Sequence, residues 1–345
     1  MIVYKIVLTG GPCAGKTKVL EPLSKKLESE GYYVIVVPET ASEYIRAKIL
    51  PNTLSREHTL MFQDLMFCTQ KIKEESAEKY ANFIKNKRDV IILYDRALMD
   101  NRGYLSQEDY DNLLKKYSIN ELELLDKYDL VIDLISTATA KKESYELNDT
   151  RSEPIELAEK RDKLTTLAWL LHRNLKVVKP TDQIEEKIDI VYNYVKQLIN
   201  NEQRKNLINV EVDGSQINYD RYNENNSKQI NIKNIYLNNF DNTDSKFILQ
   251  RRQYNKHVSY IYEKSSDTFI ESSKSISHDE YIEKIELFGI EKIENISVLS
   301  FVDEGNHFKL VNKNKNTYLE TDLKNILCVP SYIPLKKQYI KTFTK

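Results

Sequence analysis

Hydrophobic positions follow two different patterns along this chain of 345 residues, and the change falls near residue 200. Before that point, compact apolar runs rich in β-branched residues alternate with longer stretches that repeat apolar residues at helical spacing. The runs predicted as strands are 2–8, 33–38, 89–95, 128–135 and 175–178. Strands that alternate with helices predict an α/β fold, here a doubly wound, five-stranded parallel sheet whose strands are buried.

A long helical segment separates the second and third predicted strands, running from Ser55 to about Lys87. We expect most of its apolar side chains to lie in the core. They are Leu60, Phe62, Leu65, Met66, Ile72, Tyr80 and Phe83. Gln63 and Gln70 lie on the same helix, and spacing alone favours a solvated Gln63 over one that recognises a substrate.

The second pattern begins after a polar stretch, 200–205, that we interpret as a linker. From Leu207 onward the apolar runs are short and alternating, and Asn, Asp, Ser and Gly punctuate them, which predicts antiparallel strands. These strands are 230–237, 246–252, 257–264, 297–302, 307–310 and 317–320. We therefore expect two domains, residues 1–201 and 206–345, the second an antiparallel α+β module resembling a barrel.

The composition is that of a soluble globular protein, with 30% charged and 41% hydrophobic residues and a formal net charge of −1. No apolar run approaches the roughly 20 residues that span a membrane, so we expect no transmembrane segment and a cytoplasmic protein. No basic, aromatic-lined groove is evident, so nucleic acid is not an expected partner. The three cysteines lie far apart without a Cys-x-x-Cys, which argues against a disulfide framework and structural zinc.

The first strand leads into a glycine-rich loop, Gly10-x-x-x-x-Gly15-Lys16-Thr17, and a helix follows, which is the context that a P-loop requires. Glycines let successive backbone N–H groups converge on phosphate oxygens, the lysine reaches the outer phosphates, and the threonine hydroxyl ligates Mg²⁺. The residues expected to bind the nucleotide here are Gly10, Gly11, Ala14, Gly15, Lys16 and Thr17. The motif predicts ATP or GTP with Mg²⁺ and does not choose between the two.

Acidic residues end two of the other strands, at the edge where α/β sheets bind ligands. Asp95 holds the position of a Walker B carboxylate, so we expect it to bind Mg²⁺ or to orient its water. Glu39 is expected to act as general base toward an acceptor hydroxyl or as an indirect Mg²⁺ ligand, with capping of the next helix as the alternative. Arg96 is either part of the site or a structural ion pair.

Two further segments complete the expected site. The polar stretch 138–171 stands where a lid would carry arginines to the transferring phosphate, and we favour Arg151 over Arg161 for that role. Thr181 and Asp182 follow the fifth strand, in a loop of the kind that contacts the nucleotide base.

Six segments of the first domain carry a family resemblance, namely 9–17, 37–41, 94–100, 148–153, 169–172 and 181–187. Together they look like the AAA-type P-loop domain of the NadR and TRPL-translocation-defect family, over about residues 1 to 200. The resemblance implies Lys16 and Thr17 at phosphate and Mg²⁺, Asp95 near the metal, and Arg151 in a lid. It implies either a small-molecule kinase similar to nicotinamide riboside kinases or a GTP-binding protein that binds phospholipid.

The second domain is similar to the CYTH-like domain that accompanies this P-loop domain in the same proteins. The similarity rests on strand order, on Arg251 and Arg252 before a hairpin turn, and on a helix that opens at Ser277. The Glu-x-Glu-x-Lys opening of triphosphate-tunnel enzymes is absent, because strand 231–237 reads Asn-Ile-Lys-Asn-Ile-Tyr-Leu, so triphosphate hydrolysis is not expected. Arg251, Arg252 and Lys264 either hold an anionic ligand, such as a phospholipid headgroup, or face solvent as ordinary strand residues.

These predictions combine into a Mg²⁺-dependent P-loop protein that hydrolyses or transfers the γ-phosphate of ATP or GTP and carries a CYTH-like domain that senses anionic ligands. If it is a kinase, its acceptor is a small molecule such as a nucleoside. The alternative is a GTP-binding switch whose slow hydrolysis regulates phospholipid binding and membrane traffic, peripherally at membranes.

Overall fold

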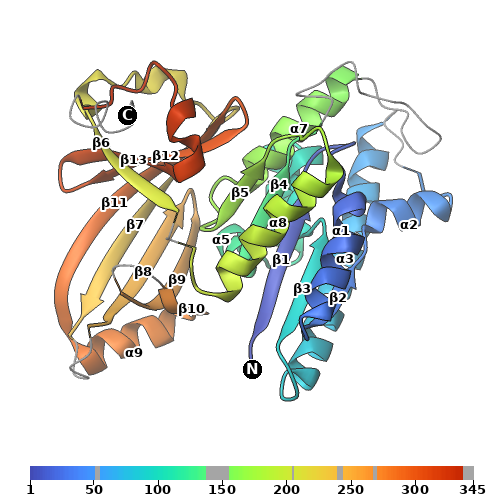
Figure 1. Ribbon diagram of the computed structural model, residues 1–345, viewed down its shortest axis with the longest axis horizontal. Helices are drawn as coiled ribbons and strands as arrows, with labels where there is room; N and C mark the ends of the chain where they lie inside the picture. Colours follow the sequence, from blue (N-terminus) through green and yellow to red (C-terminus); the bar gives the residue numbers. More distant parts are fainter. Residues whose placement is uncertain (51–54, 137–154, 204–205, 239–243, 267–269, 337–345) are drawn as a thin grey trace. The chain divides into compact units, whose positions relative to one another are not determined.

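The computed structural model describes residues 1–50, 55–136, 155–203, 206–238, 244–266 and 270–336 (Figure 1). The chain forms two compact units. The first comprises Met1–Ile119 and Lys127–Lys196, and the second comprises Asn120–Asp126 and Gln197–Lys345. A short segment from the first half of the sequence therefore belongs to the second unit.

The sheet of the first unit is parallel and five-stranded, which confirms the fold class predicted for this part of the chain. Its strands, in the order β2-β3-β1-β4-β5, are β1 (Val3–Thr9), β2 (Tyr33–Val37), β3 (Val90–Asp95), β4 (Leu130–Leu134) and β5 (Leu175–Val178). β1 is central, and β3 and β4 on either side of it are buried throughout. The prediction of a buried second strand is wrong, because β2 forms an edge of the sheet and Val37 alone of its residues is buried.

Helices cover both faces of this sheet, as right-handed crossovers require. They are α1 (Lys16–Ser29), α2 (Thr40–Arg46), α3 (Arg56–Ile84), the 3₁₀ helix η1 (Leu98–Tyr104), α4 (Gln107–Lys116), α7 (Ile155–Trp169) and α8 (Ile184–Ile199). On one face, Lys26 of α1 forms an ion pair with Asp189 of α8 (3.1 Å). On the other face, α3 and α7 both pack against η1, where the indole N–H of the fully buried Trp169 donates to Asp100 (3.2 Å).

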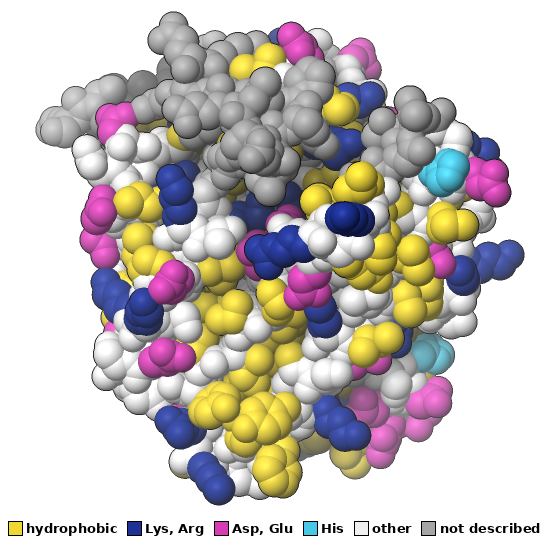
Figure 2. Space-filling view, turned by 90° about the vertical axis from the view of Figure 1, so that its right-hand side faces the viewer, with side chains coloured by type: hydrophobic (Ala, Val, Ile, Leu, Met, Phe, Trp, Pro, Cys, Tyr) yellow, Lys and Arg dark blue, Asp and Glu magenta, His cyan; other side chains and the backbone are white. Residues whose placement is uncertain are grey.

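The long helix α3 is less buried than predicted. Four of the apolar side chains expected in the core are exposed, namely Leu65, Ile72, Tyr80 and Phe83. Figure 2 looks onto this side of the first unit and shows hydrophobic side chains at its surface. The physical reason is length, since a helix of 29 residues runs about 43 Å whereas the five residues of edge strand β2 span about 17 Å. The prediction of a solvated Gln63 is also wrong, because Gln63 and Gln70 are both buried.

The second unit is built on an antiparallel sheet of eight strands in the order β10-β9-β8-β7-β11-β12-β13-β6. They are β6 (Leu207–Val212), β7 (Ser227–Leu237), β8 (Lys246–Tyr254), β9 (His257–Ser265), β10 (Ile270–Ile276), β11 (Ile290–Asp303), β12 (Asn306–Lys313) and β13 (Asn316–Asp322). All six predicted strands are present, and β6 and β10 were not predicted. The sheet is strongly curved (Figure 1), and in the part of the chain that the structure describes β6 and β10 are its edges, so it is open rather than a closed barrel.

Short helical elements complete the second unit. They are α5 (Glu121–Asp126), η3 (Gly214–Gln216), η4 (Tyr219–Arg221), α9 (His278–Phe288) and η5 (Leu323–Cys328). The predicted start of α9 is correct, because Ser277 caps the helix through the backbone N–H of Glu280, whose carboxylate accepts from the backbone of Ser277 in return.

Buried polar contacts hold α5 against β8 and β9. Arg252 of β8 forms an ion pair with Asp126, and the hydroxyl of Ser259 donates to the same carboxylate (2.7 Å). The side-chain amide of Asn120 donates to the carbonyl of Val258 (2.7 Å). Arg252 is 2% exposed, so this cation lies inside the unit rather than at its surface.

Candidate functional site

The glycine-rich loop joins the carboxyl end of β1 to the start of α1 and passes close to two other elements. Gly10 has φ +134°, and a Cβ there would lie 2.1 Å from the carbonyl oxygen of Leu134. A Cβ on Gly11 would lie 2.5 Å from Oδ1 of Asp162. Gly15, the N-cap of α1, has φ +85°. Gly10 and Gly11 leave room for β4 and α7, which approach the loop backbone, and Gly15 is favoured by its positive φ, which side chains other than glycine rarely adopt.

Lys16 and Thr17 open the helix that follows this loop. Lys16 is buried, and its ammonium donates to the carbonyl oxygens of Gly10 (3.1 Å) and Gly11 (3.2 Å). Burial lowers the pKa of Lys16, and the nearby Arg96 acts in the same direction. Thr17 is exposed, so its hydroxyl is accessible to a ligand at the first turn of α1.

A carboxylate from α7 holds the start of the loop, and no sequence pattern had predicted it. Asp162 is buried, and its Oδ1 accepts from the backbone N–H of Gly11 (2.8 Å). Its two oxygens also accept from the backbone N–H of Ser136 (3.2 Å each), whose hydroxyl donates to the carbonyl of Pro12. Asp162 therefore ties the loop to the segment after β4.

Asp133, the fourth residue of β4, lies beside Thr9 in the sheet register and is fully buried. Its carboxylate accepts from the hydroxyl of Thr166 (2.6 Å). Burial, together with the neighbouring Asp162, raises the pKa of Asp133 to about 7. An acid inside an otherwise apolar run was the sequence signal that could have identified it.

Lys187 of α8 is a second buried lysine at the loop. Its ammonium donates to the carbonyl of Ala14 (3.1 Å) and lies 3.8 Å from where a Cβ on Gly15 would be. Burial lowers the pKa of Lys187. Lys187 ends segment 181–187, which contributes to the family resemblance, but its distance in sequence from Lys16 did not predict that both lysines lie at the loop.

An ion pair joins the loops that follow β2 and β3. Oε1 of Glu39 accepts from Nε of Arg96 (2.7 Å), and Oε2 accepts from the hydroxyl of Ser42 (2.6 Å). Glu39 occupies the N-cap position of α2, but its side chain makes no capping bond to the helix backbone, so the capping alternative is wrong. Arg96 has φ +68°, a conformation that is uncommon for a non-glycine residue and is often found at functional sites.

The charges around Glu39 determine its ionisation. Burial acts to raise its pKa, but Arg96 and Lys16 outweigh burial, so the pKa of Glu39 falls to about 2. The group is therefore a carboxylate at neutral pH, and a weak base in this arrangement.

Asp95 ends β3 next to this ion pair and is 6% exposed. Burial raises the pKa of Asp95 to about 6, against the opposing effect of Lys16. Its Oδ1 is buried without a hydrogen-bond partner among the residues that the structure describes. A buried oxygen of this kind is costly unless a ligand satisfies it.

Other predicted residues contribute less to this cluster. Thr181 and Asp182 lie between β5 and α8, where the hydroxyl of Thr181 donates to the carbonyl of Gln183 (2.7 Å). The guanidinium of Arg161 lies 4.7 Å from the ring centroid of Tyr104. Arg151 lies outside the described residues.

The three cations predicted to hold an anion in the second unit do not come together. Arg251 and Arg252 are neighbours on β8 and therefore point to opposite faces of the sheet. Arg252 is buried in its ion pair with Asp126, and Lys264 is paired with Glu271 (2.7 Å). Arg251 lines a cavity that is described below.

Metal-binding clusters and membrane-spanning helices would both bear on function. No group of three or more His, Cys, Asp and Glu side chains among the described residues is arranged as a metal site. None of the helices in that part of the chain is both long enough and apolar enough to cross a bilayer.

Comparisons with known proteins place the first unit in a family. Among solved structures the chain is similar to the PH1819 protein from Pyrococcus horikoshii OT3, at 12% identity over 40% of this chain and 99% of that one. The TM-score of 0.30 is too low for this likeness to inform fold or function. No curated protein matches the sequence. A family model described as AAA domain matches residues 5–187, more than half of the chain, and contains the loop and its surrounding charges. The chain therefore belongs to this AAA domain family.

Proposed function

We propose that the first unit binds ATP or GTP with Mg²⁺ and cleaves or transfers the γ-phosphate. The observation that carries the proposal is the pairing of a phosphate loop with Asp95, whose buried oxygen lacks a partner among the described residues. Family membership supports a nucleotide as the ligand. The cost of leaving that oxygen buried is offset if a cation binds beside it.

The residues present fit Mg²⁺. This ion takes oxygen ligands and is held in phosphate sites by one or two side chains together with phosphate oxygens and water, which agrees with the lack of a three-residue metal cluster in the described part of the chain. Asp95 and the exposed hydroxyl of Thr17 would hold it. When bound, the ion supplies positive charge that neutralises charge developing on the phosphates.

The protein's own groups bind and orient the phosphates and position the arginine. Backbone N–H groups of the loop and the ammonium groups of Lys16 and Lys187 orient the phosphates and stabilise their negative charge. A carboxylate with a pKa of about 2 removes a proton poorly, so we assign Glu39 mainly to positioning Arg96 toward the transferring phosphate. We keep contact with an acceptor hydroxyl as a second role for Glu39, and a lid role for Arg151.

The test is turnover by the purified full chain with ATP or GTP and Mg²⁺, with and without a panel of nucleosides that includes nicotinamide riboside. Phosphate release and the masses of the products are measured. The Lys16→Ala variant should abolish turnover, whereas Lys18→Ala, an exposed lysine two residues along the same helix, should retain it. Retained turnover in Lys16→Ala would overturn the proposal.

The same assay separates the two forms of the reaction. An acceptor that accelerates turnover and emerges phosphorylated identifies a small-molecule kinase. Slow turnover that no acceptor changes identifies a nucleotide hydrolase, and lipid binding would then be measured in each nucleotide state. We further propose that the second unit binds an anionic ligand, at a site that differs from the one expected from the sequence.

A further inference from the structure

One face of the sheet in the second unit carries two apolar clusters with a polar belt between them. The first cluster includes Leu299, Phe301, Phe308 and Leu310. The second includes Ile235 and Leu249, and Tyr281 of α9 packs on it. Alternate residues of a strand share a face, so Leu299 lies on the same face as Ser297, and Ile235 lies on the same face as Lys233. Ser297 and Lys233 belong to the two polar rows that separate the clusters on this one face.

The belt consists of two cross-strand rows. In one row, Thr317, Asn312, Ser297, Asn231 and Gln253 are successive register partners across five strands. In the other row, Asn295, Lys233 and Arg251 are partners across β11, β7 and β8. Asn231, Lys233 and Asn295 are exposed, and Thr317 alone of the eight belt residues is buried, so the belt is open to solvent between the two apolar clusters.

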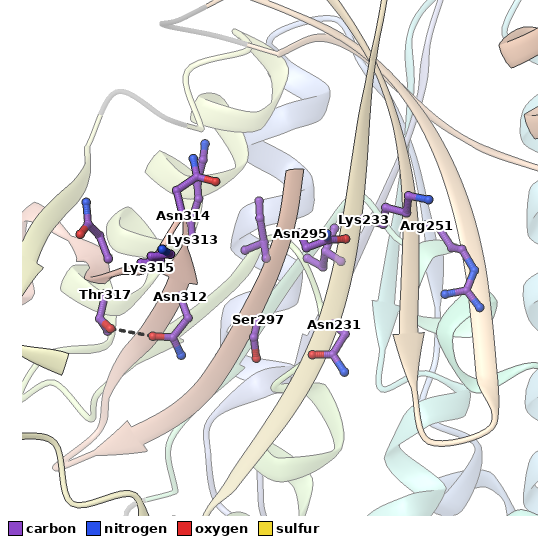
Figure 3. A pocket seen from close by; sticks show the side chains of 13 residues that line it. Asn231, Lys233, Arg251, Asn295, Ser297, Asn312, Lys313, Asn314, Lys315 and Thr317 are labelled. Carbon is purple, nitrogen blue, oxygen red and sulfur yellow. Dashed lines mark hydrogen bonds between the residues drawn. The ribbon is translucent and has the colours of Figure 1, made fainter. Parts of the chain in front are cut away.

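All the belt residues except Gln253 line a cavity of about 570 Å³. Figure 3 shows side chains from β7, β8, β11 and β12 along it, with the hairpin turn after β12 at one end. Its volume is in the range of small-molecule sites. The lining contains Asn, Ser, Thr, Lys, Arg and Ile, and includes neither an acidic nor an aromatic residue.

Two of the lining cations are neighbours across strands, toward the end of the cavity that lies away from the hairpin turn (Figure 3). Lys233 and Arg251 are register partners on adjacent antiparallel strands, where like charges destabilise the sheet. Arg251 donates to the side-chain carbonyl of Gln253 (2.8 Å), a neutral group. By contrast, Lys313 at the edge of the cavity is neutralised by Glu294 (2.9 Å). A sheet that keeps an unfavourable pair of charges gains if an anion binds between them.

The lining also limits the chemistry of that anion. Two adjacent cations match a phosphate monoester, which carries between one and two negative charges at neutral pH, better than a single carboxylate. Without an acidic residue the wall offers no ligand for Mg²⁺, and without an aromatic residue it offers no stacking surface for a base. The amides and hydroxyls around the cations suit a ligand with several hydroxyl groups.

We infer that this cavity binds a phosphorylated polyhydroxy compound without a metal ion, with the phosphate between Lys233 and Arg251 and the hydroxyls along the asparagine row. The inference deepens the proposal of an anion-binding second unit; it keeps Arg251 from the expected residues and pairs it with Lys233 in place of Arg252 and Lys264. It does not depend on the reaction of the first unit.

Calorimetric titration of the full chain with glucose 6-phosphate in EDTA tests it. Binding should be unchanged when Mg²⁺ replaces EDTA, weaker for inorganic phosphate, and absent for glucose. Lys233→Gln and Arg251→Gln should each weaken binding at least tenfold. Lys246→Gln removes an exposed cation on the opposite face of β8 and should leave binding unchanged.

Two further measurements identify the source of the ligand and keep the two proposals separate. Co-sedimentation with phosphatidylcholine vesicles that carry a phosphatidylinositol monophosphate tests whether the same chemistry is borne by a lipid headgroup. Lys16→Ala should retain glucose 6-phosphate binding, and Lys233→Gln should retain nucleotide turnover. Binding that needs Mg²⁺, binding that neither cavity variant weakens, or no binding to either probe would overturn the inference.

Discussion

The buried ion pair between Arg252 and Asp126 gives the sharpest test of how the second unit is assembled. Replacing Arg252 with Met keeps a side chain of similar length but removes the buried cation that faces the Asp126 carboxylate. Replacing Asp126 with Leu removes the other partner. Each single change leaves one charge buried without its opposite charge.

The expected cost follows from burial. Both side chains are at most 2% exposed, and breaking a buried pair of this kind costs about 3–5 kcal/mol. Replacing both partners with apolar residues removes the desolvation penalty along with the attraction, so the double variant should lie within about 1 kcal/mol of the parent or above it. Arg251→Met, at the next and partly exposed position, should change stability by less than about 0.5 kcal/mol.

Hydrogen exchange measured by mass spectrometry suits a chain of two units, because it reports on β8 and β9 directly and does not assume a single unfolding transition. Each single variant should speed exchange in these strands by roughly 10²- to 10⁴-fold, since about 1.4 kcal/mol corresponds to a factor of ten. The double variant should restore slow exchange. Single-variant costs that simply add in the double variant would refute the reasoning.

Two other predictions concern the loop and acid stability. Lys187→Met should weaken nucleotide binding by roughly 10- to 100-fold, because it removes a charged hydrogen-bond donor worth about 1.5–3 kcal/mol beside Ala14. Lys196→Met, on the same helix, should leave nucleotide affinity unchanged. Titration with a fluorescent nucleotide measures both affinities, and equal values for the two variants would contradict the assignment. Burial acts to raise the pKa of Glu294, but bonds from lysines including Lys313 outweigh it and lower the pKa to about 2, below the value of roughly 4.3 in an unfolded chain. This stabilisation is therefore present above the unfolded pKa and lost as pH falls toward 2. Urea unfolding in that range should show a flatter pH dependence for Glu294→Gln, and an unchanged slope would contradict the prediction.

Local patterns predicted the elements that depend on local physics. The five strands of the first unit are runs of β-branched residues, and the glycine-rich loop requires glycine because backbones approach it, so both are visible in a short window of sequence. The helix start at Ser277 was found for the same reason, because a capping box is a local motif.

The features that the sequence did not predict are those whose environment is set by elements distant in the chain. Asp162 reaches Gly11 across 151 positions, and Lys187 reaches Ala14 across 173, so neither spacing carries a signal. Burial in β2 depends on its place at the sheet edge, which strand propensity does not encode.

Arg251 and Arg252 show the same limit. Because they are adjacent in sequence, they suggested one cationic site, but neighbouring strand residues face opposite sides of the sheet, so Arg251 lines the cavity and Arg252 pairs with Asp126. The pairing with Asp126 could not be predicted, because residues 120–126 come from the first half of the chain.

The path of the chain decides which experiments can separate the two units. The boundary between them crosses the chain three times, after residues 119, 126 and 196, so no single cut divides the protein. A fragment that begins at residue 206 would lack α5 and would leave Arg252 without its partner Asp126. Loss of ligand binding by such a fragment would therefore report a damaged fold as readily as a missing site. Point substitutions avoid this ambiguity, because Lys16→Ala and Lys233→Gln each change one side chain within a single unit.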